Sequence, residues 1–196
     1  MGRVMSEDLA FERAQTRNAF GAELGRTPKS GGMEHARDSA EAMQKRVEGK
    51  GLDQFGNADN PRIHYETTGP EIWEQTGGRV THFVSAMGTT GTISGVSRYL
   101  KEKNPGIQII GAQPQEGSRI PGIRKWPQEY LPKIYDPRSV DELVYVSQDD
   151  AEAMCRRLAS EEGIFARISA AGARSVSQQI ALREQDAAMV CVCCDC

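Results

Sequence analysis

The sequence predicts an α/β fold in which a mostly parallel sheet is flanked by helices. Short apolar runs alternate along the chain with segments whose apolar residues recur at helical spacing. The run Ile107–Ala112 is nearly continuous in apolar residues, as expected of a strand that is covered on both faces of a sheet. Hydrophobic residues make up 38% of the chain and charged residues 26%, which favours a folded globular protein over a disordered one.

The first fifty residues are mostly polar and give weaker signals than the rest. A helix is predicted over Glu7–Phe20, and a clearer one over Glu34–Val47, where apolar residues recur at helical spacing. A short strand is predicted over Leu52–Phe55. It runs into Gly56–Pro61, a polar cluster that is typical of a turn.

The remaining residues predict strands and helices in turn. Pro70 fits the first turn of a helix that runs through Gln75. Ser147 is expected to cap a helix, with Asp150 three residues on, and Gly163 to end it in a left-handed conformation. The other predicted elements are strands over Val80–Met87, Ile107–Ala112, Glu142–Val146 and Ala188–Cys194, an extended segment over Ile164–Ser169, helices over Ile93–Lys103 and Ala170–Arg183, and a long loop over Gln113–Pro137.

Charge and hydropathy argue against two classes of partner. The formal net charge of −3 is unlike that of a nucleic-acid-binding surface, which needs a basic stripe. No apolar run approaches the roughly eighteen residues of a membrane helix, and the N-terminus carries no signal-peptide core. We therefore expect a cytoplasmic protein of one domain, or two small lobes, that binds neither nucleic acid nor membrane.

The five cysteines are unevenly distributed, with Cys155 alone and the others at Cys191, Cys193, Cys194 and Cys196. An odd number in a cytoplasmic chain does not suggest a disulfide framework. The C-x-C-C-x-C spacing could gather a soft metal ion. The same segment also reads as a buried strand in which cysteine is a small hydrophobe, and this second interpretation predicts no metal site.

The segment Gly88-Thr89-Thr90-Gly91-Thr92 follows the predicted strand Val80–Met87 and precedes a predicted helix. A strand that turns directly into a helix presents backbone N–H groups without partners at the positive end of the helix dipole, which suits a phosphate. The glycines allow close approach, and the threonine hydroxyls add donors. The alternative is a tight turn capped by threonine. The pattern matches neither the dinucleotide nor the nucleoside-triphosphate motif, so a small cofactor phosphate fits best.

Several motifs resemble the cysteine synthase family of pyridoxal-phosphate (PLP) enzymes, of fold type II. The sequence Pro114–Ser118 with Ile120–Pro127 is similar to the B-type branch, O-acetylserine sulfhydrylase B. The likeness runs from about Ala19 to Asp195. The other motifs that carry it are Asp53–Asn57, Thr67–Trp73, Met87–Thr92 and Gly95–Tyr99.

The resemblance implies roles for individual residues. Gly88, Thr89, Thr90, Gly91 and Thr92 would hold the phosphate of pyridoxal 5'-phosphate, and Ser169 would hydrogen-bond its ring nitrogen.

Three further residues, Gln54, Arg124 and Trp126, would lie near the substrate. The implied reaction forms L-cysteine by β-replacement from O-acetylserine and a sulfur donor, sulfide or thiosulfate. The implied assembly is a homodimer.

The family's Schiff-base lysine and its Ser/Thr-Gly-Asn loop belong to a region that precedes the matched motifs, and neither motif occurs in this sequence. We therefore expect a truncated chain, with a remnant of the smaller lobe over 1–50, a larger phosphate-binding domain over 51–196, and no catalytic lysine. Arg167 is a bulky cation where the family has a small residue. Impaired cysteine synthase activity is the first hypothesis, a non-catalytic relic that binds PLP or a partner protein the second, and nucleotide binding the third.

Overall fold

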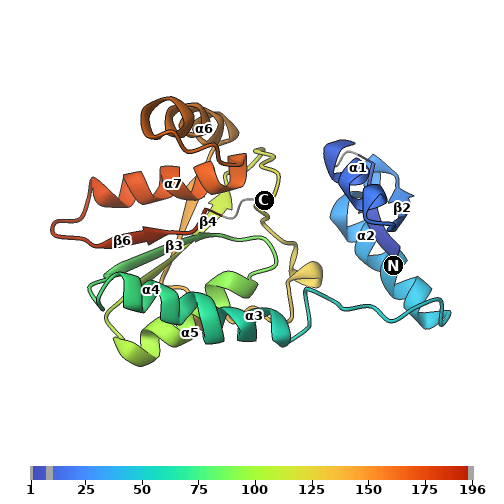
Figure 1. Cartoon of the computed structure of the whole chain (residues 1–196), viewed down its shortest axis with the longest axis horizontal. Coiled ribbons are helices and arrows are strands. Elements are labelled where there is room, and N and C mark those ends of the chain that lie inside the picture. Colours follow the sequence, from blue (N-terminus) through green and yellow to red (C-terminus); the bar gives the residue numbers. More distant parts are fainter. Residues whose placement is uncertain (1, 8–10, 194–196) are drawn as a thin grey trace. The chain divides into compact units, whose positions relative to one another are not determined.

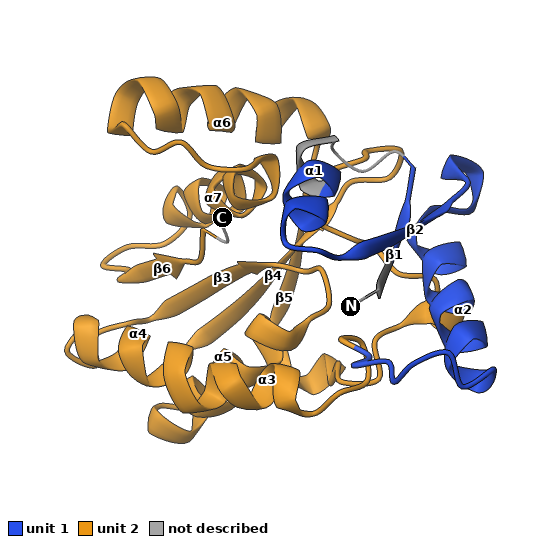
Figure 2. Cartoon of the chain, turned by 45° about the vertical axis from the view of Figure 1, so that its right-hand side comes forward, with its two compact units in different colours: residues 1–53 blue, residues 54–196 orange. Residues whose placement is uncertain are grey.

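The computed structural model describes residues 2–7 and 11–193. The chain divides into two compact units, Met1–Asp53 and Gln54–Cys196 (Figure 2). This division lies three residues beyond the boundary expected from the sequence. Each unit is described by itself.

The first unit is a small strand–helix–strand element followed by a second helix. The strands β1 and β2 pair in parallel, from Gly2 opposite Glu23 to Ser6 opposite Thr27. The predicted helix over Glu34–Val47 is confirmed as α2. The elements are β1 (Gly2–Ser6), α1 (Phe11–Ala19), β2 (Glu23–Thr27), a 3-10 turn (Lys29–Gly31) and α2 (Gly32–Lys45).

The second unit carries a four-stranded sheet with strand order β5-β4-β3-β6, and all of its described strand pairs are parallel (Figure 2). The predicted α/β fold with a parallel sheet is therefore confirmed. The strands are β3 (His82–Ala86), β4 (Gln108–Pro114), β5 (Glu142–Val146) and β6 (Met189–Cys191). The helices are α3 (Asp59–Ile63), a π-helical turn (His64–Thr68), α4 (Gly69–Gln75), α5 (Gly91–Lys103), α6 (Gln148–Glu162) and α7 (Ile168–Ala181), with 3-10 turns at Gln128–Tyr130 and Pro137–Ser139.

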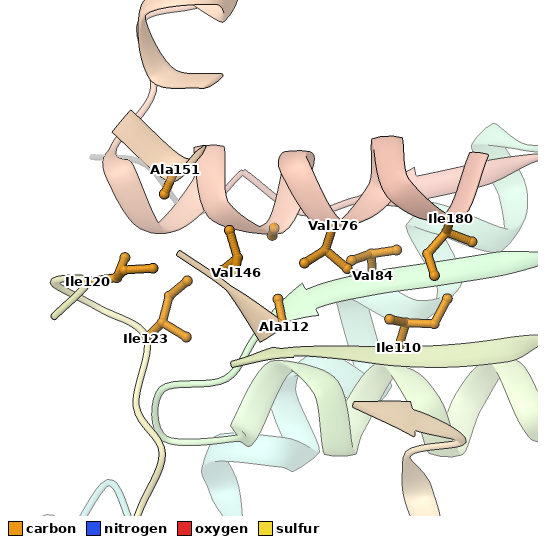
Figure 3. Packing of buried hydrophobic residues seen from close by; sticks show 10 residues of the cluster. Val84, Ile110, Ala112, Ile120, Ile123, Val146, Ala151, Val176 and Ile180 are labelled. Atoms are coloured by element: carbon orange, nitrogen blue, oxygen red, sulfur yellow. The ribbon is translucent and has the colours of Figure 1, made fainter. Parts of the chain in front are cut away.

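Helices cover both faces of this sheet (Figure 1). On one face, Val176 and Ile180 of α7 pack against Val84 and Ile110 of the central strands (Figure 3). On the other face, α4 and α5 pack against residues of the sheet such as Phe83 of β3, which is fully buried. Because the central strands are buried on both sides, their sequences are nearly continuous in apolar residues. Packing between two layers of helices fixes the C-terminal end of β3, and the candidate site lies beside this end.

The ends of α6 follow the sequence prediction. The Ser147 hydroxyl accepts a hydrogen bond from the backbone N–H of Asp150, at 3.0 Å. Gly163 closes the helix with φ of 69°, in the left-handed region that glycine adopts without strain. Both predictions rested on residue types whose chemistry acts locally, and both are confirmed.

Three predicted segments differ from the structure. The strand expected over Leu52–Phe55 is wrong, because these residues form coil and a turn. The turn predicted over Gly56–Pro61 gives way to α3 at Asp59, and helical structure then continues to Gln75. Pro61 is compatible with this helix because it lies in the first turn, where its missing N–H has no helical partner to lose. Helix α7 begins at Ile168, so the extended segment predicted to reach Ser169 is shorter.

Candidate cofactor-phosphate site

The loop between β3 and α5 is held in a strained backbone conformation. Thr90, the residue just before the helix, has φ of 71°, in the left-handed region. A non-glycine residue there costs about 1 kcal/mol or more, and such strain clusters at ligand sites. The loop is anchored on one side by the N–H of Met87, which donates to the carbonyl of Ala112 at 3.1 Å, and on the other by the N–H of Ser94, which donates to the carbonyl of Thr90 at 3.0 Å.

A cavity of about 150 Å³ opens beside this loop. That volume is enough for several water molecules or for a phosphate group. It brings together parts of the sequence that lie more than seventy residues apart. The lining residues are Ala86, Gly88, Thr89, Thr90, Gly91, Thr92, Gly122 and Ser169.

The donor set fits a phosphate. The hydroxyl oxygen of Thr90 is buried and has no hydrogen-bond partner within the described part of the chain, although a buried hydroxyl normally has one. The side chain of Thr90 does not cap α5 either. An anion at the N-terminus of α5 would satisfy this hydroxyl and would lie at the positive end of the helix dipole.

Two glycines of the loop have no room for a side chain. A Cβ at Gly88 would lie 2.9 Å from the carbonyl oxygen of Gly122, and a Cβ at Gly91 would collide with the side chain of Asn60. Because these two positions carry no side chain, the loop backbone can pack closely against Gly122 and Asn60 on one side and approach a ligand on the other. The five residues of the predicted loop Gly88–Thr92 thus form one continuous cradle along the cavity.

Side chains from α3 and the π-helical turn support the cradle from behind. Asn60 donates from Nδ2 to the hydroxyl oxygen of Thr89 at 3.2 Å and to the backbone carbonyl of Gln54 at 2.7 Å. The Nε2 atom of His64 lies 3.2 Å from the hydroxyl oxygen of Thr92. Neither Asn60 nor His64 was identified as a site residue from the sequence, where Asn60 was assigned to a turn.

Ser169 lies in the first turn of α7 and lines the same cavity as the loop. Gly122, with φ of 98°, faces it so closely that a Cβ there would be 2.9 Å from the Ser169 hydroxyl oxygen. The structure therefore brings Ser169 and Gly88–Thr92 together. The role of Ser169 at a cofactor ring stays a prediction. Arg167, at the N-cap position of α7, is half-buried.

The predicted substrate-side residues lie around the loop rather than in this cavity. Trp126 donates from Nε1 to the carbonyl of Gly88 at 2.8 Å, and its ring meets Phe55 edge to face with centroids 5.3 Å apart. The guanidinium of Arg124 lies 5.9 Å from the Trp126 ring centroid. The side chain of Gln54 is exposed, and its backbone carbonyl is what contacts Asn60. Their contact with a substrate remains a prediction.

Other candidate groups lie away from the cavity. Hydrogen bonding with Cys193 and burial raise the pKa of the Cys191 thiol well above its usual range. Cys194 and Cys196 lie outside the described residues. Within residues 2–7 and 11–193, no group of three potential metal ligands occurs and no helix is long and apolar enough to span a membrane.

Comparison with known proteins identifies the family. A family model described as "Pyridoxal-phosphate dependent enzyme" matches residues 3–195. The chain belongs to this family. It is similar to cysteine synthase B of Pseudomonas aeruginosa, with 56% identity over 192 residues, which is 98% of the chain and 64% of that relative. Cysteine synthase B of Escherichia coli is 53% identical over 195 residues, which is 100% of the chain and 64% of the relative.

Solved structures agree with this assignment. O-ureido-L-serine synthase matches with a TM-score of 0.87 and 30% identity over 96% of this chain and 62% of that chain. A cysteine synthase from Entamoeba histolytica matches with a TM-score of 0.84 and 33% identity, over 98% and 61% of the two chains. The predicted resemblance and the fold type II arrangement are confirmed. The chain spans just under two thirds of the length of these relatives.

Proposed function

We propose that this chain is the PLP-phosphate-binding part of a cysteine synthase, which forms L-cysteine from O-acetylserine and a sulfur donor by β-replacement. The observation that carries the proposal is the single cavity lined by Gly88–Thr92 and by Ser169, with the buried Thr90 hydroxyl lacking a partner. When bound, PLP supplies an electron sink that suits loss of a β-substituent and addition of a thiol nucleophile.

The residues of this chain bind and orient the cofactor in the proposal. The hydroxyls and backbone N–H groups of Gly88–Thr92 hold the phosphate. Ser169 hydrogen-bonds the ring nitrogen, and the packing against Gly122 keeps its hydroxyl in place. Trp126 holds the loop through the carbonyl of Gly88. Gln54 and Arg124 are proposed to act on the substrate side.

The cavity lining contains no lysine. Most of the described lysines are exposed, and Lys101 pairs with Asp141 at 2.7 Å. We therefore propose that the isolated chain holds PLP without a covalent bond and that its turnover is slow. The second candidate, a non-catalytic relic, differs in predicting no turnover even at high enzyme concentration.

The test separates binding of the cofactor's phosphate from binding of its pyridine ring. Purified chain is titrated with PLP and with pyridoxal, which lacks the phosphate, in the wild type and in the variants Thr90→Ala and Ser169→Ala. We expect Thr90→Ala to weaken only PLP binding, and Ser169→Ala to weaken both ligands alike. Equal affinity of the wild type for PLP and pyridoxal would contradict the proposal.

Borohydride reduction followed by mass spectrometry decides whether any lysine bonds to the cofactor. An assay with O-acetylserine and sulfide decides between slow turnover and none. A lysine adduct with substantial turnover would overturn the proposed lack of a covalent bond. A cytoplasmic homodimer is proposed as the biological state, and light scattering of the purified chain tests the dimer.

A further inference from the structure

His64 joins the cradle to the helix behind it through both ring nitrogens. Its Nε2 atom lies 3.2 Å from the hydroxyl oxygen of Thr92, which lines the cavity. Its Nδ1 atom lies 2.9 Å from the hydroxyl oxygen of Thr68. His64 and Thr68 are the first and last residues of the π-helical turn, a rare element that is frequent at functional sites.

A neutral imidazole has one N–H donor and one acceptor nitrogen, so His64 donates in one of these two contacts and accepts in the other. If Nδ1 carries the hydrogen, then Nε2 accepts from Thr92 and the hydroxyl hydrogen of Thr92 is used. If Nε2 carries the hydrogen, it donates to the oxygen of Thr92, and the hydroxyl hydrogen of Thr92 is free to point into the cavity. Only the second arrangement lets Thr92 donate to an anion.

The surroundings keep this ring neutral and in place. Burial lowers the pKa of His64 below its ordinary value. The charged side chains of the same helical segment and of α5 pair with one another, as in Arg62 with Glu66 and Arg98 with Glu102. A Cβ at Gly95 of α5 would lie 2.7 Å from the Cβ of His64, so the two helices approach too closely for the ring to shift freely.

We propose that His64 is a positioning residue that donates from Nε2 to Thr92 and thereby fixes the Thr92 hydroxyl as a hydrogen-bond donor to the bound phosphate. Thr68 completes the chain by donating to Nδ1. The inference rests on the proposed function of the Gly88–Thr92 loop, and it adds a residue from outside that loop to the phosphate site.

Two substitutions of similar size test the direction of the bond. His64→Gln places an amide N–H near the position of Nε2, whereas the shorter His64→Asn reaches only the position of Nδ1. We expect His64→Asn to lower the affinity for PLP about tenfold, the effect of one lost bond to a charged group. His64→Gln should keep most of the wild-type affinity for PLP. The affinity for pyridoxal should be unchanged in both variants.

The matched control is His82→Gln, because His82 lies on β3, does not line the cavity and contacts Thr81 at 2.8 Å. It should leave PLP affinity unchanged. A double variant with Thr92→Val should be no weaker than Thr92→Val alone, because His64 acts through that hydroxyl. Equal losses in His64→Asn and His64→Gln, or additive losses with Thr92→Val, would overturn the proposal.

The unmodified protein provides a second measurement that needs no variant to fold. The chain has three histidines, so nitrogen-15 spectra of the rings can be assigned with His35 and His82 as internal references. With inorganic phosphate or PLP bound, His64 should carry its hydrogen on Nε2. Hydrogen on Nδ1 in the bound state would overturn the inference alone, and a wild-type chain that binds neither ligand would overturn the proposed function with it.

Discussion

Replacing Thr90 by glycine is expected to stabilise the chain without cofactor and to weaken its hold on PLP. Thr90 is in the left-handed region, with φ of 71°, and its buried hydroxyl has no partner within the described residues. Relief of the backbone strain is worth about 1–2 kcal/mol, and removal of the buried hydroxyl about 1–3 kcal/mol. Glycine loses about 0.5–1 kcal/mol through backbone entropy, and the lost methyl about 0.8 kcal/mol.

The expected result for Thr90→Gly is therefore a gain of about 2 kcal/mol in the free energy of unfolding. Thr90→Ala removes the hydroxyl but keeps the strain, so it should gain less than glycine by about 0.5–1 kcal/mol. Both variants should bind PLP about tenfold more weakly, because the hydroxyl that would donate to the phosphate is gone.

The assay is urea unfolding followed by tryptophan fluorescence, because both tryptophans, Trp73 and Trp126, lie in the second unit. The two variants together separate strain from hydroxyl burial. A glycine variant less stable than the wild type would contradict the expected relief at Thr90, and an alanine variant as stable as the glycine one would contradict a strained backbone there.

Three further outcomes are expected. Gly91→Ala should destabilise the chain by about 1–3 kcal/mol through overpacking against Asn60, and adding Asn60→Ala should recover part of the loss in a thermal melt. Trp126→Phe should lower the free energy of unfolding by about 1 kcal/mol, since the bond to the Gly88 carbonyl is lost; no change in urea unfolding would contradict it. Because burial lowers the pKa of His64 in the folded state, its contribution to stability is present above about pH 6.5 and is lost as the pH falls toward the folded-state pKa. The free energy of unfolding should therefore decline below that pH more steeply in the wild type than in His64→Gln.

The sequence predicted the loop that lines the cavity because its signals were local. The apolar strand, the glycine–threonine loop and the helix after it are contiguous, so one short stretch defines the cradle. Ser147 and Gly163 likewise act on backbone groups within a few residues of themselves, and the structure confirms both caps.

The parts that the sequence did not predict depend on contacts between residues far apart in the chain, or on segments with weak apolar periodicity. Asn60 and His64 meet the loop across 29 and 28 residues, and only the docking of the π-helical turn on α5 brings them there. Pro61 was assigned to a polar turn but lies in the first turn of α3. The strands β1 and β2 were missed because residues such as Gly25 and Arg26 give no apolar alternation, and β2 nevertheless pairs in parallel through its backbone.

Backbone amide chemical shifts show whether Gly88–Thr92 holds the phosphate of PLP. Spectra of the chain are recorded with PLP, with pyridoxal and with inorganic phosphate. We expect large shifts at the amides of Gly88–Thr92 with PLP and with phosphate and small ones with pyridoxal, whereas loop shifts that are the same for PLP and pyridoxal, or PLP binding that leaves the loop amides unshifted, would contradict a phosphate site in this loop.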